Sequence, residues 1–304
     1  MSTTAPAGEL AAYLDMQRGR VEAALERAVS TLTAGLAEDV GAAARHGVTS
    51  GGKRLRPVLC VVAYEACGGS VDDAAYDLAA SLELIHAYSL MHDDLPCMDD
   101  ADLRRGRATT HRATGEDATM RAGAALIPAA ALQALTACAD LGCEPERGVE
   151  VARALLQAAG AGGMVGGQWI DLLGEGQGLG AEELDDLHRR KTGALLEASL
   201  VMGGLAAGAT PDVLAALRSY GGAIGLAFQI TDDILDATQS AETLGKNPSD
   251  AVLDKSTYVS LYGLQEARSR AEHEVARALA ALASAGLEAP MLRALARYVV
   301  EREK

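Results

Sequence analysis

Aromatic side chains are scarce in this chain of 304 residues, at 3% of the sequence, with a single tryptophan and a single phenylalanine. Sheets favour aromatic and β-branched residues, whereas alanine and leucine are strong helix formers. The 49% of apolar residues must therefore build the core mainly from alanine, leucine, valine and isoleucine. We expect closely packed helices, with Trp169 and Phe228 buried among them.

Basic residues and paired cysteines are also few. Lysine and arginine number 27 against 42 acidic residues, for a formal net charge of −15. This argues against a nucleic acid partner, because phosphate backbones attract basic surfaces. The five cysteines form no CxxC pair, so reduced thiols fit better than a disulfide framework or a zinc site. The N-terminal segment lacks the basic start and apolar core of a secretory signal, and we expect a cytoplasmic protein.

Uninterrupted apolar runs are lacking as well. The longest stretch, from about Gly123 to Ala139, contains Pro128 and Gln133. It is typical of a buried core helix rather than of a membrane span, and we expect no stable membrane insertion. No segment alternates polar and apolar residues for long enough to indicate a sheet.

Apolar residues instead recur at helical spacing, so the sequence predicts one all-α domain over residues 1–304. The predicted helices are roughly 8–36, 54–67, 72–94, 116–140, 147–170, 181–207, 211–236, 257–284 and 289–302. A polar hinge at 46–52 separates the first two. The polar stretch 237–256 is predicted to be either a surface loop or a mobile lid.

Two acidic clusters each follow an apolar, helix-like segment. They read HDDLPCMDD at 92–100 and QITDDILD at 229–236. The C-terminal end of a helix carries partial negative charge, and adjacent carboxylates about 4 Å apart near a surface repel by about 4 kcal/mol. A single cluster could be a solvated helix end, but two such unfavourable arrangements indicate bound divalent cations. Carboxylate oxygens are hard ligands and favour Mg2+.

The spacing within the clusters supports a metal site. Asp232 and Asp236 are four residues apart and share one helix face. Asp93 and Asp99 are out of phase on a helix, but Pro96 between them would end it. The intervening residues can then bulge outward and bring Asp99 back toward Asp93.

Cationic residues flank both clusters, as a diphosphate site would require. GGKRLRP at 51–57 precedes the first cluster and DLRRGR at 102–107 follows it. Of only five lysines in the chain, four lie near the clusters, namely Lys53, Lys191, Lys246 and Lys255. A chain that otherwise uses arginine has kept a compact ammonium at these places, which suits a point charge on a phosphate.

Six motifs in order make the chain resemble the bacterial farnesyl/geranylgeranyl diphosphate synthases of the trans-isoprenyl diphosphate synthase family. They are GGKRLRP at 51–57, LIHAYSLMHDDLPCMDDADLRRG at 84–106, GGQWIDL at 166–172, HRRKTGAL at 188–195, GLAFQITDDILD at 225–236 and LGK…DKSTY at 244–258. They cover most of the chain, and six in order are far more specific than one DDxxD. The resemblance implies the isoprenoid synthase fold, a helical bundle around a deep central cavity, usually as a homodimer.

The resemblance also implies roles for individual residues. About three Mg2+ ions per active site would hold the allylic diphosphate, and the implied ligands are Asp93, Asp94, Asp99, Asp232, Asp233 and Asp236. The cations implied to bind the allylic diphosphate are Arg104, Lys191, Lys246 and Lys255. Gln168 and Asp171 would line the same site, and Thr192 and Gln229 would face the developing allylic cation. The implied site for isopentenyl diphosphate comprises Gly52, Lys53, Arg56, His86 and Arg105.

The length of the product should depend on the helix before the first cluster. Tyr88 and Ser89 lie five and four residues before Asp93, one helical turn deeper, so Tyr88 would form the floor of a cavity that receives the growing chain. An aromatic at this position with the two-residue insert resembles C15 producers, so we expect farnesyl diphosphate. The stretch DDLPCMD also resembles many C20 synthases, and geranylgeranyl diphosphate stays open.

Other classes of protein fit less well. Intact aspartates argue against a non-catalytic subunit, and a terpene cyclase would not need Lys53, Arg56 and Arg105 together. His92-Asp93 resembles the His-Asp pair of metal phosphohydrolases, but we find no further His or Asp residues at the spacing that such a metal site would need. The chain departs from the family pattern at Ala101 and Ala124, where aspartate is frequent. The 246–255 loop also looks one residue shorter than usual.

Overall fold

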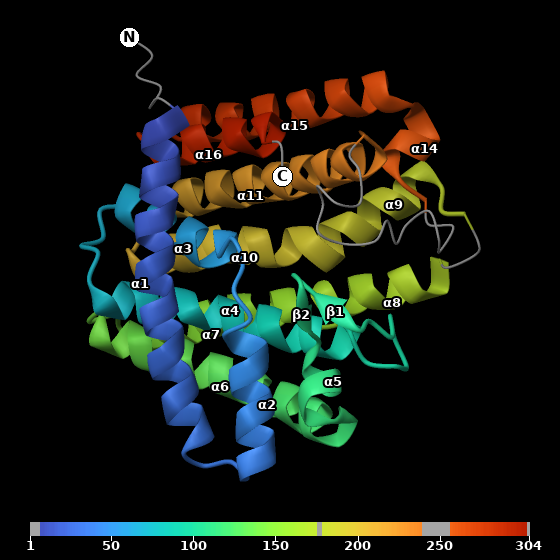
Figure 1. Cartoon of the computed structure of the whole chain (residues 1–304). Helices are drawn as coiled ribbons and strands as arrows, with labels where there is room; N and C mark the ends of the chain where they lie inside the picture. The colour runs from blue at the N-terminus through green and yellow to red at the C-terminus, as the bar shows by residue number, and fades with distance from the viewer. Residues whose placement is uncertain (1–6, 175–177, 239–255, 303–304) are drawn as a thin grey trace.

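The computed structural model describes residues 7–174, 178–238 and 256–302, and the described chain is almost entirely helical (Figure 1). The elements up to the hairpin are α1 (Ala7–Thr33), α2 (Glu38–Val48), α3 (Leu55–Ala66), α4 (Asp73–Asp93), β1 (Leu103–Arg104) and β2 (Arg107–Ala108). Then come α5 (Thr110–Thr114), α6 (Glu116–Asp140), α7 (Pro145–Ala159), α8 (Met164–Gly174), α9 (Ala181–His188) and the π-helical segment η1 (Arg189–Gly193). The last are α10 (Ala194–Ala206), α11 (Pro211–Thr238), α14 (Tyr258–Tyr262), α15 (Leu264–Ser284) and α16 (Pro290–Glu301). The predicted all-α class is confirmed.

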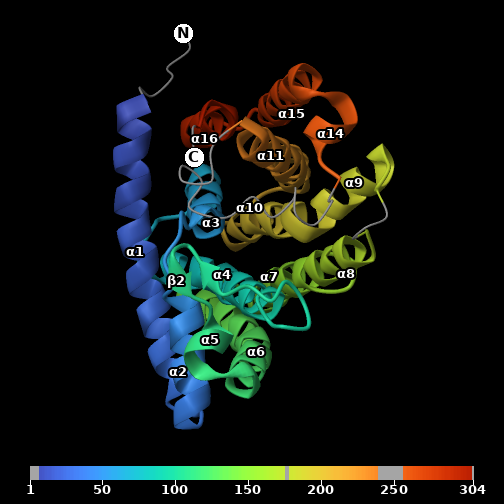
Figure 2. The same cartoon turned by 45° about the vertical axis from the view of Figure 1, so that its right-hand side comes forward.

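The long helices are arranged around α4 and α11. Helix α4 packs mainly against α6, and α11 mainly against α15, while α10 contacts both α3 and α11. Helix α1 stands upright in both views, with α2 alongside its lower part, and crosses α3 and α4 steeply (Figures 1 and 2). Helices α4 and α11 end toward the same side of the molecule (Figure 1), so both acidic clusters lie on that side.

The core is built from small aliphatic side chains, as the composition predicts. Around α4 it joins fully buried residues such as Leu82 and Ile85 to many alanines from α1, α2, α6, α7 and α10. Alanine lets helix axes approach closely without leaving voids. Phe228 is partly buried and packs on the second part of the core. The expectation for Trp169 is wrong, because α8 buries Met164 and Gly167 and leaves Trp169 61% exposed.

Several helix boundaries differ from the predicted ones, and glycine explains two of them. The predicted helix 147–170 is two helices, because the chain turns at Gly160–Gly163 so tightly that a Cβ on Gly163 would collide with the Ala158 carbonyl group. The predicted helix 257–284 is broken by Gly263, whose φ of 78° suits glycine. Helix α2 was not predicted separately, and the predicted hinge begins inside its last turn.

Two helices, α6 and α11, are long and apolar enough to cross a membrane by length and composition alone. Core helices of water-soluble proteins pass the same test. Both helices pack against other helices of the bundle, α6 against α4 and α11 against α15, which fits the expectation of core helices.

Candidate functional site

The first acidic cluster begins where α4 ends. Asp93 is the last residue of α4, and the following residues turn back on themselves. The backbone N–H of Asp99 donates to the carbonyl oxygen of Asp93 at 2.9 Å, and that of Ala101 donates to Asp94 at 3.2 Å. The predicted return of Asp99 to Asp93, across the turn that contains Pro96, is therefore confirmed.

The carboxylates of this cluster carry charge that the protein only partly compensates. The pKa of Asp93 is raised to about 6, mainly by burial and further by the charges of Asp99 and Asp94, against the opposing effects of Lys191 and Arg104. Asp94 is 3% exposed and pairs with Arg104, whose Nη2 lies 2.6 Å from Asp94 Oδ1. Arg104 comes from β1, so the short hairpin places this cation against the cluster.

The second acidic cluster lies in the last two turns of α11. Asp232 pairs with Arg302, with 2.7 Å between Oδ1 and Nη2, and Arg302 also stacks over the ring of Phe228. Asp233 is 7% exposed and accepts a hydrogen bond at 2.7 Å from the backbone N–H of Tyr258. Asp236 continues the helix one turn beyond Asp232. Sequence reasoning did not identify Arg302, because a cation near the end of the chain has no local signal.

Four of the predicted substrate-binding residues are cationic or titratable, and each has a lowered pKa. Burial is the largest cause for each of them, and it lowers the pKa of Lys53, Arg56, Arg105 and His86. Arg105 lowers the pKa of each of the other three as well. Neighbouring cations that are partly removed from water favour a bound anion, because its negative charge would offset both the lost hydration and the repulsion from Arg105.

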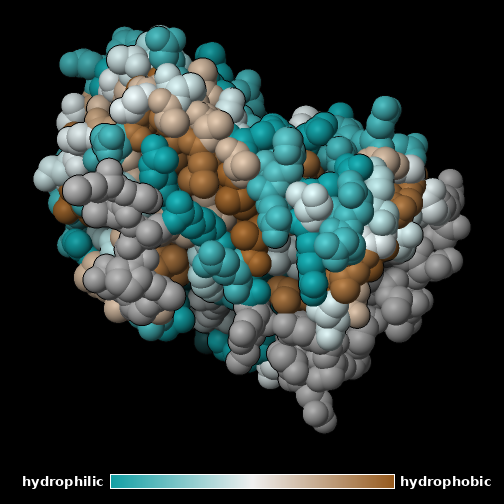
Figure 3. Space-filling model, turned by 90° about the horizontal axis from the view of Figure 1, so that it is seen from above, coloured by the Kyte–Doolittle hydropathy of each residue, from teal (hydrophilic) through white to brown (hydrophobic). Residues whose placement is uncertain are grey.

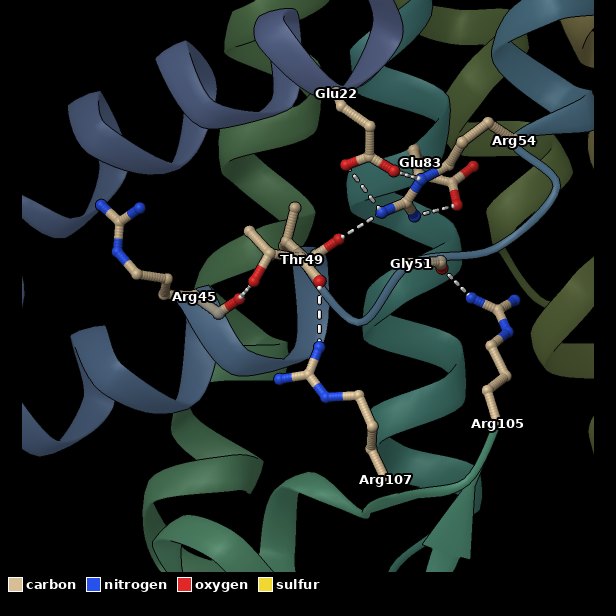
Figure 4. A network of polar contacts seen from close by, with 9 residues as sticks. Glu22, Arg45, Thr49, Gly51, Arg54, Glu83, Arg105 and Arg107 are labelled. Carbon is tan, nitrogen blue, oxygen red and sulfur yellow. Dashed lines mark hydrogen bonds and ion pairs between the residues drawn. The ribbon is translucent and has the colours of Figure 1, made fainter. Parts of the chain in front are cut away.

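The loop that carries Gly52 and Lys53 is fastened on one side, the upper side in Figure 4, by Arg54. Arg54 has a left-handed φ of 51° and is 4% exposed. Its guanidinium donates to Glu83 Oε1 at 2.6 Å, to Glu22 Oε1 at 2.7 Å and to the carbonyl oxygen of Val48 at 3.0 Å. The sequence did not single out Arg54 or Glu83, because their pairing depends on α4 lying beside this loop.

Two arginines of the hairpin fasten the same loop from the other side. Arg105 donates to the carbonyl oxygen of Gly51, and Arg107 donates to that of Thr49 at 3.2 Å. Both contacts are visible in Figure 4. Gly52 has a φ of 133°, which favours glycine, and a Cβ there would displace the Arg105 guanidinium.

A mostly apolar cavity of about 560 Å³ lies beside these groups. Viewed from above, apolar surface runs between hydrophilic groups along a hollow in the molecule (Figure 3). Among the predicted site residues, the cavity is lined by Arg56, His86, Tyr88, Ser89, Asp93, Gln168, Lys191 and Thr192. Its apolar lining includes Leu95, Met98, Met120, Met164, Trp169 and Leu172.

A smaller cavity of about 150 Å³ adjoins the first, and Lys191 and Thr192 line both. Asp171, Gln229 and Asp233 also line it. Lys191 Nζ lies 2.5 Å from Asp171 Oδ2. The structure therefore brings predicted residues from α8, η1 and α11 together around one space.

Glycines on both sides of η1 make this convergence possible. A Cβ on Gly167 of α8 would collide with the backbone of Lys191, and a Cβ on Gly225 of α11 would lie 2.8 Å from Gly193 Cα. The π-helical turn, a feature frequent at functional sites, thus lies in close contact with both helices. The sequence motifs contain these glycines but give no sign of the π-helical turn.

The donor groups of the site suit Mg2+. Among the described residues, no three His, Cys, Asp or Glu side chains converge on one point that could hold a metal ion. Mg2+ is usually bound by one or two carboxylates together with substrate phosphates and water, so a cage of three protein ligands is not needed. Both side-chain amide atoms of Gln168 are buried without a hydrogen-bond partner in the described parts of the chain. Such atoms beside Asp93 fit a site that is completed by a polar ligand.

Two predicted cations cannot be placed. Lys246 and Lys255 lie outside the described residues, as does most of the stretch 237–256. The expectations of a shortened loop and of a lid therefore stay predictions.

Comparison with known proteins assigns the chain to one family. The profile of the polyprenyl synthetase family matches residues 38–288. A dimethylallyltranstransferase of Fischerella ambigua is 42% identical over 292 residues, which are 95% of this chain and 83% of the relative. A chloroplastic geranylgeranyl pyrophosphate synthase of Catharanthus roseus is 43% identical over 263 residues, 85% of this chain and 72% of the relative. The crystal structure of an FPP/GFPP synthase from Zymomonas mobilis matches with a TM-score of 0.82 at 34% identity, covering 97% of this chain and 100% of that one.

Proposed function

Because this chain belongs to the polyprenyl synthetase family and is a prenyltransferase, we propose that it makes farnesyl diphosphate. It would condense isopentenyl diphosphate with dimethylallyl or geranyl diphosphate. The observation that carries the proposal is the apolar cavity of about 560 Å³, whose walls include the acidic Asp93 and the cations Arg56 and Lys191. An allylic diphosphate matches this cavity, because it joins an anionic head, which charged groups bind, to an apolar tail.

The head of the allylic substrate would lie between the acidic clusters. Mg2+ bound there, about three ions per site, would neutralise charge that develops on the leaving diphosphate. Its proposed ligands are Asp93, Asp94, Asp99, Asp232, Asp233 and Asp236. Arg104 and Lys191, with Lys246 and Lys255 from beyond the described residues, would add positive charge to the same diphosphate. Gln168 and Asp171 would orient it.

Isopentenyl diphosphate would bind to the mutually repelling cations. Gly52 lets the backbone approach the anion, and Lys53, Arg56 and Arg105 would share its charge. The low pKa of His86 keeps its ring neutral near pH 7, so it would act as a hydrogen-bonding group.

The reaction itself requires a shielded carbocation. Ionisation of the allylic C–O bond leaves a cation that Thr192 and Gln229 would face with their oxygen atoms. Water is kept away by the apolar lining of the cavity. The double bond of isopentenyl diphosphate then attacks C1, and a proton leaves the adjacent carbon to the departed diphosphate.

The product length would be set by Tyr88, with Ser89 beside it. Tyr88 lines the cavity, and its ring packs edge-on against His92 with centroids 4.8 Å apart. This contact supports the floor role, because it restrains the ring. Geranylgeranyl diphosphate is the second candidate, since several relatives carry that name.

A homodimer is proposed from the outer face of α6, α7 and α8. Large apolar side chains are exposed along these three consecutive helices, and those that do not line the cavity are Leu132, Leu135, Val149, Leu156 and Leu173. Large apolar side chains exposed in this number are typical of a protein that has a partner surface. We expect Leu132→Glu to convert the dimer to a monomer in sedimentation equilibrium, with the far-UV CD spectrum unchanged. A wild-type protein that sediments as a monomer would contradict the proposal.

We further propose that residues 1–304 form one polyprenyl synthase domain and that the protein works in the cytoplasm on these small diphosphates. Nucleic acid and membrane insertion have no part in this function.

The test is a Mg2+-dependent condensation assay with labelled isopentenyl diphosphate and dimethylallyl, geranyl or farnesyl diphosphate. Products are sized after dephosphorylation. We expect elongation to stop at C15, EDTA to abolish it and Tyr88→Ala to lengthen the product. A wild type that reaches C20 refutes the floor role and keeps the reaction, whereas folded protein without any elongation refutes the proposed function.

A further inference from the structure

His188 lies beside the second acidic cluster, of which Gln229 and Asp233 line the same smaller cavity, without belonging to either cluster. It is the last residue of α9, directly before the π-helical turn that carries Lys191 and Thr192. Its side chain lines the smaller cavity, and the residue is 8% exposed. The ring stacks on that of Tyr258, with centroids 5.6 Å apart and planes 23° apart.

The imidazole contacts the amide of Gln229, which lies 41 residues away in the chain. Gln229 Nε2 is 3.4 Å from His188 Nδ1. In this orientation of the amide its nitrogen donates, so Nδ1 accepts and the ring proton is assigned to Nε2. Burial lowers the pKa of His188 to about 4, which keeps the ring neutral and Nδ1 available as an acceptor. His188 Nε2 is buried and has no hydrogen-bond partner in the described structure.

This contact decides which end of the Gln229 amide faces the reaction. With its N–H group held by His188, the amide must direct its oxygen away from the imidazole. A reversed amide would present N–H, the positive end of the dipole, to a developing cation. We propose that His188 is a positioning residue that fixes the Gln229 amide so that its oxygen faces the allylic cation. The inference rests on the proposed function, because it needs that cation.

Neighbouring contacts hold the imidazole in place. The backbone N–H of Tyr258 is bound to Asp233 at 2.7 Å, and its hydroxyl donates to Asp185. Tyr258 is thus fixed at both ends and gives the His188 ring a rigid surface. The imidazole can tilt little, so Nδ1 stays directed at Gln229.

Three substitutions of His188 separate positioning from packing. His188→Phe keeps an aromatic ring for the stack on Tyr258 and removes the acceptor. His188→Asn puts a side-chain oxygen close to the position of Nδ1, and His188→Gln puts one near Nε2 instead. Supporting groups of this kind typically change activity by about 10- to 100-fold. We expect His188→Phe to lower kcat by about that factor with both KM values changed less than about threefold. His188→Asn should recover most of the loss and His188→Gln little of it.

The decisive measurement repeats these variants in a Gln229→Leu background. If His188 acts through the Gln229 amide, His188→Phe should lower kcat of the Gln229→Leu enzyme by less than about threefold. An equal fold loss in both backgrounds, or a loss confined to KM, overturns the proposal. If His188→Phe does not fold, His188→Asn and His188→Gln in both backgrounds give the same comparison.

The wild-type assay distinguishes a failure of the proposed function from a failure of the positioning role of His188. A wild type that performs no condensation refutes the proposed function, and the positioning role is refuted with it. An active wild type with equal losses in both backgrounds refutes the positioning role alone.

Discussion

Replacing Arg54 with methionine should destabilise the protein far more than its place in a surface loop suggests. Arg54 is 4% exposed and joins Glu22 of α1, the Val48 carbonyl of α2 and Glu83 of α4. Methionine has a similar length and is flexible enough to fill the space. Glu83, 3% exposed, would then carry a buried charge without its cation. Breaking such a buried pair costs about 3–5 kcal/mol.

Arg107 provides a matched control on the same loop. Arg107 also donates to this loop, at Thr49, but it is exposed, so Arg107→Met should cost less than about 1 kcal/mol. Equilibrium unfolding in urea gives both values. Replacing Glu83 with glutamine as well should recover part of the loss, since no buried charge then remains.

The same variant should affect one substrate selectively. Because Arg54 holds the backbone next to Gly52 and Lys53, Arg54→Met should raise the KM for isopentenyl diphosphate more than that for the allylic substrate. An Arg54→Met loss within about 1 kcal/mol of the Arg107→Met loss would refute the reasoning, as would strict additivity with Glu83→Gln.

Two further predictions concern helix packing and pH. Gly123→Ala should lower kcat, because its Cβ would collide with the imidazole of His92, next to the first acidic cluster. In the control Gly148→Ala, the added Cβ would meet Cys138 Cβ at 3.5 Å, an ordinary contact. This variant should keep kcat and gain up to about 1 kcal/mol of stability. Equal kcat values for Gly123→Ala and Gly148→Ala would contradict the prediction. For pH, the pKa of His188 is about 4 in the folded protein and about 6.5 when unfolded, so the unfolded chain takes up the proton first. Stability from this group is complete above pH 6.5 and is lost as the pH falls toward 4, by about 2 kcal/mol between pH 7.5 and pH 5. In urea unfolding, the wild type should lose about 2 kcal/mol more than His188→Phe over this pH range, because His86, whose pKa burial also lowers, contributes equally in both proteins. Parallel pH profiles would rule the effect out.

Much of the fold could be predicted because it depends on local pattern. The predicted bounds of one central helix, 116–140, coincide with α6, since its composition and its flanking glycines act over a few residues. The return of Asp99 to Asp93 also followed from a local cause, the proline between them. The composition likewise predicted a core of small aliphatic side chains.

Contacts between segments that are distant in the sequence could not be predicted from local pattern. The pairing of Arg54 with Glu83 spans 29 residues, that of Gln229 with His188 spans 41, and that of Arg302 with Asp232 spans 70. Trp169 is exposed at the wall of the open cavity, whereas Met164 and Gly167 are the buried residues of α8. No local pattern specifies which residues of α8 are buried. By itself the sequence determined the helical class, the acidic clusters and the residue types of the site. Only the tertiary structure decided which charges meet and which remain uncompensated, because burial and mutual distance depend on how the helices pack.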